Sequence, residues 1–242
     1  MVPRPISGGL MLSYKCSASC RHCMYACSPK WESDWIKEDD LIQGLSKLSA
    51  SIKPSPSGGQ SVSLNYGMHF TGGEPFLNFE LLLGAVEIAE RFQIPSTFVE
   101  TNCFWCVDDE ATREKLRLLK EAGLKGILIS VNPYYAEYVA FERTERCVRI
   151  SKEVFADNVM VYQTEYYQLF TRLGIKKRIS LDDYLELTQG ENLAKRVELF
   201  LMGRAALQLK EFYPKYSARS FFRVPCQPPI LRPWHNHFDN YG

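Results

Sequence analysis

Residues 10 to 23 read Leu10-Met11-Leu12-Ser13-Tyr14-Lys15-Cys16-Ser17-Ala18-Ser19-Cys20-Arg21-His22-Cys23, an apolar segment that runs directly into a loop carrying three cysteines. A second apolar segment, 66–71, is followed in the same way by Gly72-Gly73-Glu74-Pro75. Both segments have the length and apolar content of buried strands. Because reactive groups gather at the carboxyl ends of parallel strands, we expect the cysteine loop and the Gly-Gly-Glu-Pro turn to lie on one rim.

Short apolar runs alternate with segments of helical periodicity along most of the chain. Asn78 and Asp108 are expected to cap two of the helices. Six βα units in about 200 residues predict an α/β fold, a partial (β/α)6 barrel of the TIM type with a short C-terminal appendage. The predicted strands are 10–15, 66–71, 97–101, 127–131, 159–163 and 197–202, and the predicted helices are 37–49, 79–92, 109–122 and 138–155, with further helical segments from about 165 to 196.

Composition and charge exclude several classes of protein. Lys and Arg total 29 against 28 for Asp and Glu, so no net field favours nucleic acid, and Lys176-Lys177-Arg178 is expected to be a solvated loop. No apolar run approaches the roughly 20 residues that span a bilayer, and the N-terminus lacks the apolar core of a secretory signal. We therefore expect a cytoplasmic protein without a membrane partner. Its eight cysteines then indicate metal binding or redox chemistry rather than disulfides.

The cysteine loop is the strongest candidate site. Three thiolates in a short loop can hold an iron–sulfur cluster, and three ligands for four irons leave one iron open to a further ligand. The alternative is structural zinc, for which Cys20 and Cys23 could combine with Cys103 and Cys106. Spacing alone leaves these two possibilities equal.

The rest of the pattern carries a resemblance. Cys-x3-Cys-x2-Cys after the first predicted strand, with Thr71-Gly72-Gly73-Glu74-Pro75 after the second, resembles the radical S-adenosylmethionine (SAM) superfamily over residues 10–209. The resemblance implies a 4Fe-4S cluster on Cys16, Cys20 and Cys23, whose open iron binds the amine and carboxylate of SAM. It further implies reductive cleavage of SAM to a 5′-deoxyadenosyl radical that abstracts hydrogen from a substrate. Flavodoxin or ferredoxin would supply the electron, and oxygen would destroy the cluster.

The same resemblance suggests residues that bind the cosubstrate. His22 holds a position usually filled by an aromatic residue, whose backbone contacts the adenine. Gly72, Gly73 and Glu74 would receive the amino group of SAM through a carboxylate or carbonyl oxygen. Ser130 and Asn132, at the end of the fourth predicted strand, match the place of ribose contacts. Taken alone, a Gly-Gly-Glu-Pro stretch is a simple turn, and short polar residues also end strands routinely.

The remaining cysteines leave alternatives open. A fourth ligand would close the open iron, so we expect Cys27 to be non-ligating. Cys103 and Cys106 could be buried thiols, a redox-active or substrate-handling pair, or ligands of an additional metal site.

The C-terminal part resembles enzymes with an auxiliary-cluster extension, the SPASM and twitch-like group. The residues that carry this are Phe200-Leu201-Met202-Gly203-Arg204-Ala205, then Cys226, and then 234–242, which resembles the opening hairpin of the extension. The further cysteines of a second cluster are missing, so we expect either a truncated chain or a lost extension. This divides the chain into a core, 1–209, and a tail, 210–242. His235 and His237 could form a metal pair on a strand face or simply belong to the hairpin.

The sequence thus predicts a radical SAM enzyme, with a peptide or protein side chain as the expected substrate. Two rivals remain: a non-catalytic zinc-binding barrel protein, and an inactive partner with the radical SAM fold.

Overall fold

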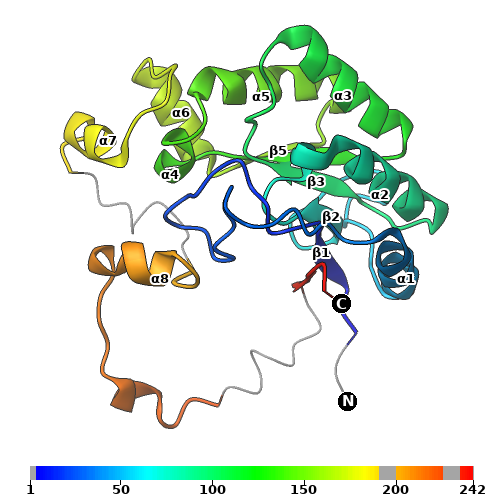
Figure 1. The fold of residues 1–242 in the computed structure, drawn as a ribbon, viewed down its shortest axis with the longest axis horizontal. Coiled ribbons are helices and arrows are strands. Elements are labelled where there is room, and N and C mark those ends of the chain that lie inside the picture. Colours follow the sequence, from blue (N-terminus) through cyan, green and yellow to red (C-terminus); the bar gives the residue numbers. More distant parts are fainter. Residues whose placement is uncertain (1–3, 191–199, 226–234, 242) are drawn as a thin grey trace.

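The computed structural model describes residues 4–190, 200–225 and 235–241. Within these ranges the chain forms an open, wholly parallel sheet of six strands in the order β5-β4-β3-β2-β1-β6 (Figure 1). This confirms the predicted α/β class and the open partial barrel. The strands are β1 (Ser7–Met11), β2 (Gly67–Thr71), β3 (Phe98–Thr101), β4 (Gly126–Ser130), β5 (Val159–Tyr162) and β6 (His235–Phe238).

Four amphipathic helices cover the outer face of the sheet (Figure 1). Asn78 and Asp108 cap two of them as predicted, because their side chains accept the backbone N–H of Leu81 and Ala111. Strand residues such as Phe70 point into this layer, and the residues that alternate with them point to the inner face. The four helices are α1 (Glu38–Ser49), α2 (Phe79–Arg91), α3 (Asp109–Glu121) and α5 (Phe141–Phe155).

A second apolar cluster lies on the other side and joins the cysteine loop to the short helices. It contains Met11 of β1, Cys16 and Cys20 of the loop, and the buried rings of Tyr134 and Tyr166. The cysteine loop is therefore part of a packed core, not a free surface loop. The short helices are α4 (Pro133–Ala136), α6 (Thr164–Arg172), α7 (Leu181–Leu187) and α8 (Ala205–Gln208), with 3-10 turns at Pro75–Asn78, Lys210–Phe212 and Ala218–Phe221.

The sixth strand is not where the sequence predicts it. Of the segment 197–202, residues 197–199 lie outside the described part, and 200–202 form no strand and leave their apolar side chains 43–54% exposed. The sixth strand is instead β6, which pairs in parallel with β1, so the predicted hairpin at 234–242 is also wrong over its described residues. Gly8 permits this pairing, since a Cβ there would lie 2.6 Å from the backbone oxygen of Asn236.

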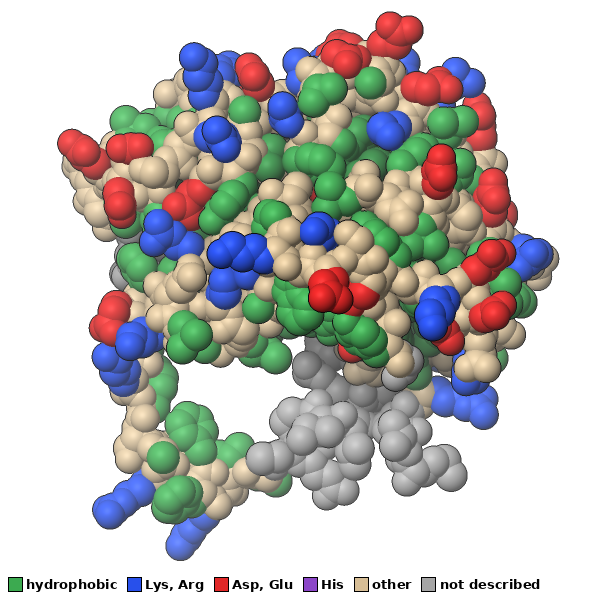
Figure 2. Space-filling model, viewed as in Figure 1, with side chains coloured by type: hydrophobic (Ala, Val, Ile, Leu, Met, Phe, Trp, Pro, Cys, Tyr) green, Lys and Arg blue, Asp and Glu red, His purple; other side chains and the backbone are tan. Residues whose placement is uncertain are grey.

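Acidic and basic side chains are interspersed over the face shown in Figure 2, without a patch of one sign. Among the described residues, no helix combines the length and the apolar character needed to cross a membrane.

Candidate functional site

The cysteine loop leaves β1 and folds back on itself at the rim of the sheet. The backbone N–H of Cys16 donates to the carbonyl of Ser28 at 3.2 Å, and that of Cys23 donates to the carbonyl of Cys20 at 3.1 Å. Cys16 and Cys20 are buried, and Cys23 is half-buried. The loop is therefore held by its own backbone before any ligand is considered.

The Gly-Gly-Glu turn after β2 is bonded directly to this loop. Gly73 N donates to Ser13 O at 2.8 Å, and Glu74 N donates to Lys15 O at 3.0 Å. A Cβ on Gly73 would lie 1.9 Å from Lys15 O, so only glycine permits this approach. The two sequence motifs are thus in contact, on one rim, as predicted.

The Glu74 side chain points away from the loop toward the end of β3. It is buried and accepts hydrogen bonds from Thr101 Oγ1 at 2.9 Å, Asn102 N at 2.8 Å and Phe76 N at 3.4 Å. Burial raises the pKa of this carboxyl to about 8, and the hydrogen bonds oppose that shift. Because its oxygens already accept three donors, the backbone carbonyls are the better acceptors left for an incoming ammonium group.

Asn102 connects the end of β3 to the first cysteine. Its Nδ2 donates to Ser17 Oγ at 3.0 Å and lies 3.9 Å from Cys16 Sγ. Asn102 was not predicted as a site residue. Its position directly after a strand was the only feature of the sequence that could have indicated it.

Arg204 is a site residue that sequence reasoning missed. Its Nε donates to Cys20 O at 2.9 Å, its Nη1 to Ala26 O at 2.8 Å, and its Nη2 to Cys27 O. Its own backbone N–H donates to Cys23 O at 3.1 Å. The guanidinium therefore joins the middle of the cysteine loop to the residues that follow it, and brings a positive charge beside the thiols. The Gly203-Arg204 pair after the predicted sixth strand was the signal that could have found it.

The thiols differ in their electrostatic surroundings. Burial raises the pKa of Cys16 to about 12, and the neighbouring Glu74 adds to the effect. A hydrogen bond from Cys27 lowers the pKa of Cys23 to about 6, while the pKa of Cys27 rises correspondingly. Burial also raises the pKa of Cys20, and Arg204 opposes that rise. Cys27 thus interacts with Cys23 as a hydrogen-bond donor.

The loop cysteines suit a cluster better than a single ion. Four thiolates around one Zn²⁺ would lie about 3.8 Å apart, from a Zn–S bond of about 2.3 Å. Among the described residues, Cys16, Cys20 and Cys23 do not form a group whose sulfur atoms all lie within 4.8 Å of one another. In a cluster each thiolate binds a different iron, so wider separations fit it.

His22 and Asn132 meet beside the loop. The His22 ring stacks on Tyr134 at 5.0 Å and meets the edge of Tyr135 at 4.7 Å, and burial lowers its pKa to about 3. Asn132 Oδ1 caps α4 by accepting the N–H groups of Tyr134 and Tyr135. Its Nδ2 donates to Gln163 Oε1 at 2.9 Å and lies 3.4 Å from His22 Nε2. The side-chain oxygen and nitrogen of Asn132 are therefore both occupied by contacts within the protein.

Ser130 ends β4 and is buried. Its hydroxyl bonds to the Tyr135 side chain, which brings it close to the His22 stack.

Three further cysteines form a separate group in the helix-covered core. The sulfur atoms of Cys103, Cys106 and Cys147 lie within 4.8 Å of one another, and all three residues are buried. They belong to a different apolar cluster from Cys20. The four-cysteine zinc site that would combine Cys20 and Cys23 with Cys103 and Cys106 is therefore not assembled. Cys226 lies outside the described residues.

Part of this chain is similar in sequence to a curated protein. No protein-family model matches the chain. A curated relative, YydG of Bacillus subtilis (strain 168), whose name assigns it to peptide biosynthesis, is 27% identical over 132 residues. The match covers 53% of this chain and only 36% of the relative, so the aligned part spans little more than a third of that protein.

Two solved structures are also similar. One is anSMEcpe with bound AdoMet (14% identity, TM-score 0.46, covering 72% of this chain and 52% of the other). The other is BtrN with AdoMet and 2-DOIA (14% identity, TM-score 0.42, covering 96% and 89%). The two motifs, the cysteine loop and the Gly72–Glu74 turn, are hydrogen-bonded to each other at one rim of an open parallel sheet.

Proposed function

We propose that this chain is a radical SAM enzyme whose 4Fe-4S cluster is held by Cys16, Cys20 and Cys23. The observation that carries the proposal is the direct hydrogen bonding of the cysteine loop to the Gly72–Glu74 turn. This contact sets a three-thiol loop with one unfilled ligand position beside a glycine backbone that a cosubstrate can approach closely. When bound, the cluster supplies the electron that cleaves SAM.

The protein's own residues would bind and orient SAM. The carbonyl groups of Gly72, Gly73 and Glu74 would accept the ammonium of SAM. His22, with Ser130 and Asn132 nearby, would form the wall against which the adenosine lies, and the buried tyrosines around His22 would exclude water. Arg204 would fix the loop and offset the negative charge of the thiolates.

The proposed substrate, electron donor and compartment rest on general chemistry and on the relative YydG. We propose a peptide side chain as the substrate, because YydG is named for peptide biosynthesis. Flavodoxin or ferredoxin would be the electron donor, oxygen would inactivate the enzyme, and the cytoplasm would be its compartment, since the seven described cysteines are all free thiols. We take residues 1–209 as the catalytic core and 210–242 as an appendage that contributes β6 to the sheet of the core.

Anaerobic reconstitution with iron and sulfide tests the proposal. We expect about four irons per chain, as a 4Fe-4S cluster requires, and release of 5′-deoxyadenosine and methionine from SAM under dithionite. Cys20→Ala should abolish both. Cys147→Ala is the matched control, because Cys147 is equally buried but lies in the helix-covered core, and it should retain both. A colourless protein that holds one zinc, or cleavage that persists in Cys20→Ala, would refute the proposal.

A further inference from the structure

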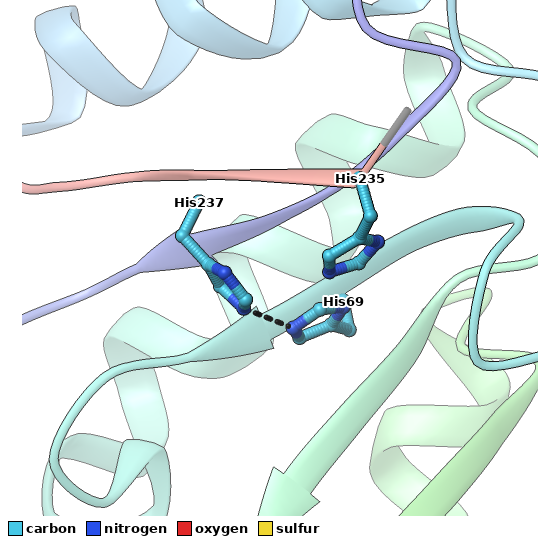
Figure 3. A group of neighbouring side chains, drawn as sticks. All are labelled: His69, His235 and His237. Carbon is cyan, nitrogen blue, oxygen red and sulfur yellow. Dashed lines mark hydrogen bonds between the residues drawn. The ribbon is translucent and has the colours of Figure 1, made fainter. Parts of the chain in front are cut away.

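Three of the four histidines in the chain converge on the inner face of the sheet, below the cysteine loop. His69 lies on β2, and His235 and His237 lie on β6 (Figure 3). One ring nitrogen from each lies within 4.8 Å of the others. The fourth histidine, His22, belongs to the cysteine loop and takes no part.

The strand register explains how residues about 170 positions apart meet. Gly9 of β1 is the register partner of His69 on one side and of His237 on the other. A Cβ on Gly9 would lie 2.4 Å from both rings. Because Gly9 has no side chain, the imidazoles of His69 on β2 and His237 on β6 can lie in contact across β1.

The separation of the nitrogens suits one small ion. His69 Nε2 and His237 Nε2 are 3.2 Å apart. Two imidazole ligands on a tetrahedral ion, at a metal–nitrogen bond of about 2.0–2.1 Å, would lie about 3.4 Å apart. A ring nitrogen of His235 lies within 4.8 Å of both.

The carboxylate of Glu100 on β3 lies next to His69. Its Oε1 is 3.3 Å from His69 Nε2, and its Oε2 accepts a hydrogen bond from Thr71 Oγ1 at 2.7 Å. Glu100 is outside the group of nitrogens that lie within 4.8 Å of one another, so it would have to approach His235 and His237 to act as a fourth, anionic ligand. Ser7 Oγ bonds to His235 Nδ1, which orients that ring and leaves its Nε2 available, an arrangement typical of metal-binding histidines.

Without an ion, the ring nitrogens of these histidines cannot all form hydrogen bonds. His69 Nε2 faces both His237 Nε2 and Glu100 Oε1, yet it can carry only one hydrogen.

We propose that His69, His235 and His237, with Glu100 as fourth ligand, form a site for one divalent transition-metal ion of the zinc class. The site is separate from the cysteine loop and does not depend on the proposed function. Neutral imidazoles and a carboxylate are ligands for Zn²⁺, Co²⁺ or Fe²⁺ rather than for Ca²⁺ or Mg²⁺. The ion would tie β6 to β2 and β3 across β1.

Cobalt(II) titration of the full chain tests this site. The background is the triple variant Cys16→Ala, Cys20→Ala, Cys23→Ala, which removes the loop thiols. We expect one equivalent of Co²⁺ with the visible bands of a tetrahedral ion and without thiolate charge-transfer bands. His237→Ala and His235→Ala should each weaken binding at least 100-fold, and Glu100→Gln about 10-fold. His22→Ala, the remaining histidine, is the matched control and should bind Co²⁺ like the parent.

The outcomes are distinct. Absence of Co²⁺ binding would mean that the three imidazoles are only a stacked part of the core, as the 5.0 Å stacking of His69 on His235 allows. Thiolate charge-transfer bands that persist in the His237→Ala variant would show that Co²⁺ binds at Cys103, Cys106 and Cys147 instead. If the triple variant does not fold, Zn²⁺ should raise the melting temperature of chelator-treated wild-type protein but not that of His235→Ala. Equal shifts in these two proteins would overturn the proposal.

Discussion

Arg204 holds the second half of the cysteine loop and the residues after it, since its side chain donates to the carbonyls of Cys20, Ala26 and Cys27. Charged hydrogen bonds of this kind contribute about 1.5–3 kcal/mol each, and they are not additive. We expect Arg204→Ala to lower the free energy of unfolding by about 2 kcal/mol or more, and to reduce the iron retained after reconstitution. Denaturant titration and iron analysis measure the two effects.

Arg219→Ala is the control for this substitution, because the Arg219 side chain is exposed. It should change neither quantity. Equal iron retention in both variants would show that the loop does not need the Arg204 side chain.

Glu74 predicts a pH dependence of stability. Its folded pKa, about 8, lies above its ordinary value of 4.5, so the native state favours the protonated form. This contribution is fully present below pH 4.5 and is lost as the pH rises toward 8. Wild-type protein should therefore lose stability relative to Glu74→Gln between pH 5 and 8, by an amount on the order of a few kcal/mol. Urea unfolding at several pH values measures it, and parallel curves for the two proteins would contradict it.

At the scale of elements, Gly9 allows β1 to lie between two histidine-bearing strands. We expect Gly9→Ala to lower the free energy of unfolding by about 1–3 kcal/mol, because its Cβ would overlap both His69 and His237. Gly44→Ala is the contrasting control, since Gly44 lies inside α1 with no atom within 4 Å of a Cβ there. It should gain about 0.5–1 kcal/mol. Thermal unfolding separates the two, and a neutral Gly9→Ala would show that β1 can shift without cost.

The sequence predicts elements well where the signal is local. Helix caps at Asn78 and Asp108 and the strands β2 to β5 follow from periodicity within a dozen residues or so. The first strand is Ser7–Met11 and not 10–15, because Ser7, Gly8 and Gly9 lack the apolar side chains on which the prediction relied. The sixth strand fails because His235–Phe238 lacks an apolar pattern and is stabilised by pairing with β1, more than 220 positions away. The contacts of Arg204 and Cys147 were not predicted for the same reason, since their partners are remote along the chain.

For the whole molecule, β6 makes β1 an interior strand. A chain ending at Pro225 would expose the edge of β1, with its unpaired N–H and C=O groups. We expect its melting temperature to fall by about 5–10 °C, the equivalent of about 2–3 kcal/mol, and light scattering to show aggregation. A chain ending at Asp239 keeps β6 and is the control. Equal melting temperatures in the two truncated chains would mean that β6 adds nothing.

The adjacency of β1 and β6 also sets a schedule for biosynthesis. β1 emerges from the ribosome long before its second neighbour, β6. At roughly 5–20 residues per second, the 228 positions between Ser7 and His235 take on the order of 10–45 s to make. Throughout that time the edge of β1 has no β6 beside it, so an ion held by His69 together with His235 and His237 can bind only after β6 has been made.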